Sequence, residues 1–167
     1  MAEKTFEEVS TAAQRYTGLS RKALEYGMLQ KRLVDRAKGP DYSADEWDQL
    51  DEFVDPDNFE RIGNFREVMT YGEMKAFLQR WCVDSHWEGS FKRITEVDNV
   101  VFLELEERNT YQGQTAVVNS VSVYEFDPAG KIRHLDIYLQ MAPLPSAGFP
   151  NEAYEQAPAA LSHGSIF

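Results

Sequence analysis

The longest regular pattern in the chain is an alternation of side chains with a period of two, from about Gly89 to Met141. Successive side chains point to opposite faces of a strand, so this period predicts β-structure. Turn residues interrupt the pattern three times and divide it into strands at about 89–97, 100–110, 114–126 and 131–141. Because short connections join antiparallel neighbours, we expect a four-strand meander.

The first half of the chain carries signals for helices instead. Three segments have the pattern of a capping box, which marks the first turn of a helix. They are Thr5-Phe6-Glu7-Glu8, Ser43-Ala44-Asp45-Glu46 and Thr70-Tyr71-Gly72-Glu73. A longer helix is expected from about Ser20 to Lys38, where Gly39-Pro40 stops it. Helices followed by a meander predict an α+β fold.

The length of 167 residues suits one domain, which we place at 1–141. The remaining segment, 142–167, contains three of the seven prolines and many small residues. We expect an ordered C-terminal tail there. It could cover an edge of the domain or act as a flap over the mouth of a pocket.

A formal net charge of −11 argues against nucleic acid and against anionic membrane surfaces as partners. No apolar run approaches 18 residues, and the first residues lack the order of a signal peptide. The single Cys82 and three scattered histidines supply no zinc or iron–sulfur spacing, so no metal is expected. These features predict a cytoplasmic protein whose partner is an apolar small molecule.

The final strand carries three groups that can move protons. His134, Asp136 and Tyr138 share one face, with about 7 Å between successive side chains. The opposite face is formed by Leu135, Ile137 and Leu139. Either the polar face lines a pocket, or it is wetted and the apolar face is core. We favour the pocket, with Asp136 as a general base, His134 as a second proton carrier and Tyr138 as a donor to an oxyanion.

The chain resembles the nuclear transport factor two-like superfamily, and especially its SnoaL-like and limonene-epoxide hydrolase-like branches. The resemblance covers about 20–141 and is carried by 47–63, by 72–78 (Gly-Glu-Met-Lys-Ala-Phe-Leu) and by 121–132 with the closing strand. It implies a cone-shaped barrel, in which a curved antiparallel sheet wraps around N-terminal helices. It also implies a homodimer formed through the outer face of the sheet.

The resemblance to the epoxide hydrolases can be followed residue by residue. Arg108 matches the arginine of that branch, and Asp136 matches the aspartate thought to activate water. Thr110 stands where a second aspartate is expected, and Leu135 where an arginine is expected. The triad is therefore incomplete. The general-base aspartate of ketosteroid isomerases would fall near 59–63, where this chain has Glu60 and Arg61.

Five further residues are candidates for contact with a substrate. Tyr26 lies on the long predicted helix, and His86 and Trp87 precede the meander. Asn119 lies among valines, and Glu106 shares the parity of Arg108. Each also has a structural interpretation: a core tyrosine, an exposed loop histidine, a satisfied core amide, or a surface ion pair between Arg108 and a glutamate.

Together these features predict an enzyme that needs no cofactor and acts by proton transfer on a neutral, largely apolar, polycyclic substrate. Isomerisation, cyclisation and dehydration fit that chemistry. One alternative is an epoxide hydrolase with water activated by Asp136. The other is a non-catalytic domain for small-molecule binding or dimerisation.

Overall fold

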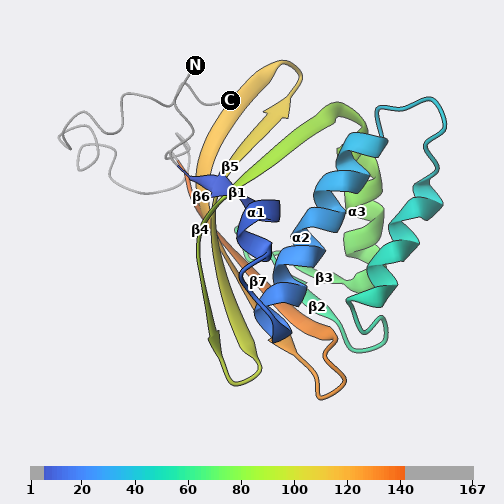
Figure 1. Ribbon diagram of the computed structural model, residues 1–167. Coiled ribbons are helices and arrows are strands. Elements are labelled where there is room, and N and C mark those ends of the chain that lie inside the picture. The colour runs from blue at the N-terminus through green and yellow to red at the C-terminus, as the bar shows by residue number, and fades with distance from the viewer. Residues whose placement is uncertain (1–5, 142–167) are drawn as a thin grey trace.

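The computed structural model describes residues 6–141, which form one curved sheet with helices packed against it (Figure 1). The predicted α+β architecture is confirmed. The predicted tail over 142–167 lies outside the described residues. The strands are β1 (Glu7–Glu8), β2 (Glu60–Ile62), β3 (Val68–Thr70), β4 (Ser85–Val97), β5 (Val100–Tyr111), β6 (Gln114–Phe126) and β7 (Ile132–Gln140). The helices are α1 (Val9–Ala13), α2 (Gly18–Arg36), α3 (Tyr71–Asp84) and the 3-10 helix η1 (Ala44–Glu52).

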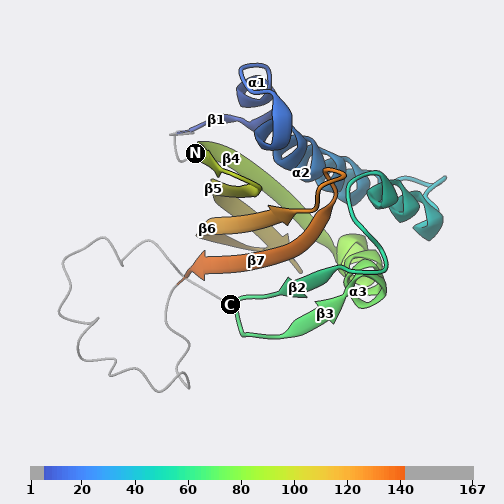
Figure 2. The same ribbon diagram turned by 90° about the horizontal axis from the view of Figure 1, so that it is seen from below.

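The strand order in the sheet is β1-β4-β5-β6-β7-β2-β3. All neighbours are antiparallel except β2 and β7, which run parallel. Figure 2 shows the sheet curling, with α2 crossing its concave face and α3 beside β2 and β3. The sheet therefore has a concave face toward the helices and a convex outer face.

Local sequence explains the meander that β4 to β7 form. The hairpin between β5 and β6 turns at Gln112 and Gly113, whose φ angles are +51° and +80°. Two consecutive positive φ angles are the geometry of a two-residue hairpin that follows the twist of the strands. The four predicted strands agree with the observed ones within a few residues, apart from the earlier start of β4 at Ser85.

Two of the three predicted capping boxes are present. Ser43 Oγ accepts from the Asp45 amide, and Thr70 Oγ1 accepts from the amide of Glu73. The third predicted box begins at Thr5, outside the described residues. After it the structure has the short strand β1 and the short helix α1, because Glu7 and Glu8 pair with β4.

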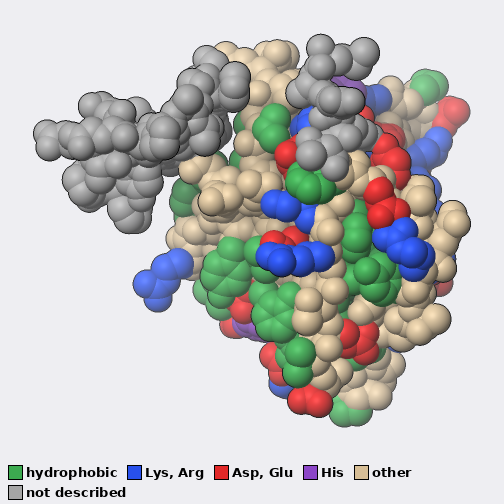
Figure 3. Space-filling model, turned by 60° about the vertical axis from the view of Figure 1, so that its left-hand side comes forward, with side chains coloured by type: hydrophobic (Ala, Val, Ile, Leu, Met, Phe, Trp, Pro, Cys, Tyr) green, Lys and Arg blue, Asp and Glu red, His purple; other side chains and the backbone are tan. Residues whose placement is uncertain are grey.

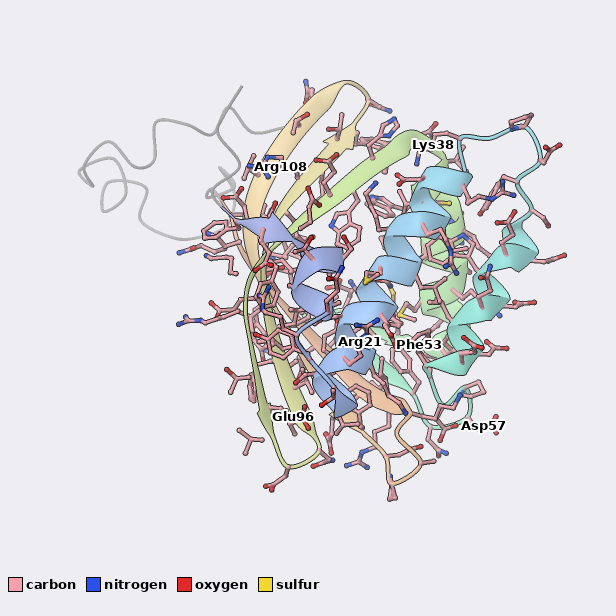
Figure 4. All side chains as sticks on the ribbon, viewed as in Figure 1. Arg21, Lys38, Phe53, Asp57, Glu96 and Arg108 are labelled. Carbon is pink, nitrogen blue, oxygen red and sulfur yellow. The ribbon has the colours of Figure 1, made fainter. Side chains whose placement is uncertain are left out.

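The N-terminus of α2 is held by a strand. The Glu96 carboxylate accepts from the Ser20 amide at 2.9 Å and from the Ser20 hydroxyl at 2.6 Å. Free amides at a helix start need such acceptors. Figure 4 shows Glu96 beside the lower end of α2. This contact fixes the N-terminus of α2 against the end of β4.

Candidate active site

A cavity of about 970 Å³ lies between the concave face of the sheet and the helices α2 and α3. Much of its wall is apolar or aromatic, with Leu103, Leu105 and Ile137 from the sheet and Phe77 and Trp81 from α3. Cavities of this size and lining are typical of small-molecule sites. The polar side chains that reach it are therefore the candidates for chemistry.

The alternation of β5 places a carboxylate in the cavity. Val101, Leu103 and Leu105 are buried on the concave face, and the next residues of the same parity are Glu107 and Asn109. Both line the cavity. Neither was predicted as a site residue, although the run of apolar side chains at odd positions of β5 could have revealed both.

Glu107 is held by an aromatic donor. The Trp87 indole Nε1 donates to Glu107 Oε2 at 2.8 Å. Gly89, which pairs with Glu107 across β4 and β5, leaves space for this contact. A Cβ on Gly89 would lie only 3.4 Å from the Trp87 ring and 3.2 Å from Leu105. The contact with Leu105 would be tight and that with the indole ordinary, so glycine fits this position beside the hydrogen bond without crowding.

The deeper part of the cavity contains two tyrosines and an arginine. The Tyr26 and Tyr124 rings meet edge to face at 5.8 Å, and both side chains are buried. Burial raises the pKa of each phenol well above its usual value, so both stay protonated at neutral pH. The positive charge of Arg61 opposes this shift at Tyr26. Arg61 itself comes from β2 and lines the cavity.

The prediction that the polar face of the last strand lines the pocket is wrong. Leu135, Ile137 and Leu139 line the cavity instead. Burying the apolar face of β7 against the helices accounts for this parity. The polar face points outward: His134 lies 3.1 Å from Asp136 and 3.4 Å from Glu60.

Tyr138, predicted as an oxyanion donor, is 59% exposed on the outer face. The geometry therefore does not support the proton-transfer roles expected for Asp136, His134 and Tyr138. Asp136 lies outside the cavity, so the geometry does not support epoxide opening by water activated at Asp136 either.

The other strand candidates also lie outside the cavity. Arg108 and Glu106 pair with each other at 2.5 Å on the outer face. Asn119 accepts from Lys92 at 3.1 Å and donates to Gln140 at 2.9 Å, so it is a satisfied surface amide. All three face outward because their parity is opposite to that of the apolar residues on their strands.

Figure 3 is turned so that the sheet side of the molecule comes forward, and hydrophobic side chains lie there among charged ones. The expected dimer through this face stays a prediction.

Tyr26 and Trp87 are the two predicted contact residues that the structure brings into the cavity. His86 is exposed and borders a separate, smaller pocket near the β5–β6 turn. Within residues 6–141, no group of three or more acidic, histidine or cysteine side chains is arranged to hold a metal ion. No helix of this part of the chain is long and apolar enough to cross a membrane.

Comparison with solved structures identifies the fold. A SnoaL-like polyketide cyclase from Agrobacterium tumefaciens superposes with a TM-score of 0.55 at 18% identity, over 75% of this chain and 93% of that one. The protein Bal32a from a soil-derived mobile gene cassette gives 0.54 at 12% identity, over 73% and 92%. The fold is that of the SnoaL-like, nuclear transport factor two-like proteins.

An LEH-like epoxide hydrolase from M. tuberculosis has the same fold, with a TM-score of 0.50 at 16% identity over 68% of this chain and 84% of that one. The fold implied by the resemblance is thus confirmed. No family model matches the sequence, and no curated protein is similar to it. At these identities the likeness establishes the fold, and the reaction has to be argued from the cavity.

Proposed function

We propose that this protein is an enzyme that moves a proton on an apolar small molecule, with Glu107 as the general base. The observation that carries the proposal is the position of this carboxylate, which lines an apolar cavity and is held by Trp87. A general base must be oriented before it can take a proton efficiently. The Trp87 donor supplies that orientation and leaves the other carboxylate oxygen, Oε1, for the substrate.

The reaction that fits best is proton abstraction from a carbon beside a carbonyl group, followed by return of the proton at the same or another carbon. The negative charge moves to the carbonyl oxygen and needs a donor there. Asn109 lies two residues along the same face of β5, about 7 Å from Glu107 by strand rise. Among the described residues its side-chain amide has no hydrogen-bond partner, so it can donate to this oxygen.

Isomerisation is the simplest outcome of these steps, because the same carboxylate takes and returns the proton. Cyclisation and dehydration begin with the same abstraction, so they belong to the same proposal. The distant cyclase neighbours are compatible with it. A non-catalytic binding domain is the alternative, since an apolar cavity alone is sufficient for binding.

Deuterium exchange tests the proposal without knowledge of the natural substrate. We would follow exchange into 2-tetralone, a bicyclic ketone with acidic C–H groups, by proton NMR in D₂O. The wild type should accelerate exchange, and Glu107→Gln should reduce the acceleration at least a hundredfold. Glu104→Gln makes the same chemical change on the outer face of β5, where Glu104 pairs with Arg93, and should exchange like the wild type.

The possible results separate the candidates. Full activity of Glu107→Gln would refute Glu107 as the base. Loss of exchange in Asp136→Asn instead would restore the assignment made from sequence. Binding of the ketone by the wild type without any exchange would favour the non-catalytic domain.

A further inference from the structure

Arg61 is the cation that the sheet contributes to the wall of the cavity. The other cations in the lining, Lys31, Arg32 and Arg36, come from α2 and have the partners Asp35, Gln49 and Glu46. The strand of Arg61, β2, pairs with β7 so that Arg61 lies opposite Leu135, a cavity residue. Residues opposite each other in a ladder share a face of the sheet, so Arg61 projects to the concave side. Its side chain is only 14% exposed. Burying a charge is costly unless it is paired, which makes the partners of this guanidinium informative.

Those partners satisfy the guanidinium only in part. Arg61 Nη1 lies 3.4 Å from Glu67 Oε1 and 3.8 Å from Met69 Sδ. Both contacts are long and use the same nitrogen. Among residues 6–141, Nε and Nη2 of Arg61 have no hydrogen-bond partner, although a guanidinium carries five N–H donors.

The acidic partner of Arg61 is held in place by the β2–β3 hairpin rather than by the arginine. Glu67 Oε2 accepts from the Phe65 amide at 2.9 Å. The carboxylate also lies over Gly63, where a Cβ would come within 1.6 Å of Oε1. Glu67 therefore orients one nitrogen of Arg61 and leaves the rest of the fork free. A planar fork with two free nitrogens matches a carboxylate.

We propose that Arg61 forms an anion subsite that binds a carboxylate of the ligand, so that the ligand is an apolar acid. This inference names the substrate class of the proposed reaction. It rests on the proposed function in one respect: the bound acid is a substrate if the protein is an enzyme, and otherwise it is a ligand. It replaces the neutral substrate expected from the net charge. Because the protein carries −11 overall, a local cation is needed to recruit an anion.

The anion subsite is remote from the general base. Glu107 pairs with Val118 of β6. Arg61 pairs with Leu135 of β7, and Leu135 in turn pairs with Tyr124 of β6. Six residues of β6 separate these two rows, roughly 20 Å along the strand. The bound carboxylate would therefore lie deep in the cavity, and the carbon that reacts would lie nearer to Glu107.

A matched pair of probes tests the subsite by calorimetry at pH 7. Naphthalene-2-acetate and naphthalene-2-acetamide have the same bicyclic body and differ in charge. The wild type should bind the acid at least tenfold more tightly than the amide. Arg61→Gln should lower the affinity for the acid to the affinity for the amide. Its affinity for the amide should stay within threefold of the wild-type value.

Arg133→Gln is the control for the change in net charge, because Arg133 pairs with Glu125 on the outer face, and it should bind both probes like the wild type. Equal affinity of the wild type for the two probes would overturn the proposal, even if Arg61→Gln failed to fold. Failure of the wild type to bind either probe would overturn it too. So would an unchanged acid affinity in folded Arg61→Gln.

The Glu107→Gln variant separates this inference from the proposed reaction. Its preference for the acid should persist, because Glu107 is remote from Arg61. If the preference persists while Glu107→Gln still exchanges deuterium, the subsite stands and the assigned base is wrong.

Discussion

The indole nitrogen of Trp87 and the carboxylate of Glu107, on neighbouring strands, are joined by a hydrogen bond of 2.8 Å inside the cavity. Trp87 does not face Glu107 directly, since the residue opposite Glu107 is Gly89 and the residue opposite Trp87 is Asn109. The bond therefore runs diagonally across the two strands. This relationship gives the proposed base a fixed orientation.

Trp87→Phe should slow the proposed deuterium exchange about tenfold. The substitution keeps an aromatic ring in the wall and removes only the donor. A hydrogen bond to a charged group is worth about 1.5–3 kcal/mol, and 1.4 kcal/mol corresponds to a factor of ten. The rate at saturating ketone should fall while the half-saturating concentration changes little.

A double-mutant cycle provides the control for this prediction. In a Glu107→Gln background, Trp87→Phe should cause no further loss of exchange, because the acceptor of the bond no longer acts as a base. An additional tenfold loss there would show that Trp87 acts independently of Glu107.

Gly27 should contribute to the open volume of the cavity and not to the stability of α2. It lies within α2 and lines the cavity, and a Cβ there would meet nothing within 4 Å. Glycine in a helix interior costs about 1 kcal/mol relative to alanine. Gly27→Ala should therefore raise the free energy of unfolding by about 0.5–1 kcal/mol. Gly27→Leu should fill the cavity and weaken binding of naphthalene-2-acetamide at least tenfold.

Gly72→Ala is the matched control, because Gly72 lies in the first turn of α3 and also has nothing within 4 Å of an added Cβ. It should leave the affinity for the amide unchanged. Unchanged binding by folded Gly27→Leu would mean that the probe does not occupy this cavity.

Much of the fold could be predicted because its signals are local. The period of two and the turn at Gln112-Gly113 gave the meander, and the capping boxes at Ser43 and Thr70 gave two helix starts. The pairing of β2 with β7 could not be predicted in this way. β2 has only three residues, and its partner lies more than 70 positions away, so its place depends on tertiary packing.

Most of the predicted site residues were wrong because their assignment depended on which face of β7 points into the cavity. Choosing the polar face of β7 as the inner one placed Asp136 in the pocket. The apolar residues Leu135 and Ile137 are the ones that burial selects. The same rule applied to β5 would have selected Glu107 over Arg108. The bond from Trp87 to Glu107 needs the register of two strands, which no local pattern supplies.

Lys38 should be important for stability, because its ammonium group joins the ends of two helices. It donates to the carbonyl oxygens of Val34 at 2.7 Å, of Cys82 at 2.5 Å and of Ser85. Figure 4 shows Lys38 at the upper end of α2. A hydrogen bond that involves a charged group contributes about 1.5–3 kcal/mol, and these three bonds are partly buried. Lys38→Met should lower the free energy of unfolding by about that amount in urea titrations.

Lys31→Met is the control, since Lys31 forms only an exposed pair with Asp35 one turn further along α2. Such pairs contribute about 0.3–0.5 kcal/mol. Equal losses in the two variants would show that the three carbonyl contacts of Lys38 add nothing to stability.

The capping box of α3 should make stability depend on pH in the acid range. Glu73 accepts from the Thr70 amide at 2.8 Å and from the Thr70 hydroxyl at 3.0 Å. These bonds hold the pKa of Glu73 below its usual value of 4.5 in the folded protein. A carboxyl whose pKa is lower when folded stabilises the fold above its unfolded pKa. The contribution is lost as the pH falls through the folded value.

The difference in melting temperature between the wild type and Glu73→Gln should therefore be constant from pH 7 to about pH 5 and should shrink below pH 4.5. Glu52→Gln serves as the control, because the Glu52 side chain is exposed and makes no hydrogen bond among the described residues. Its difference from the wild type should stay small across the range. A Glu73→Gln difference that grows on acidification would contradict the lowered pKa, since the bonds to Thr70 would then favour the protonated side chain.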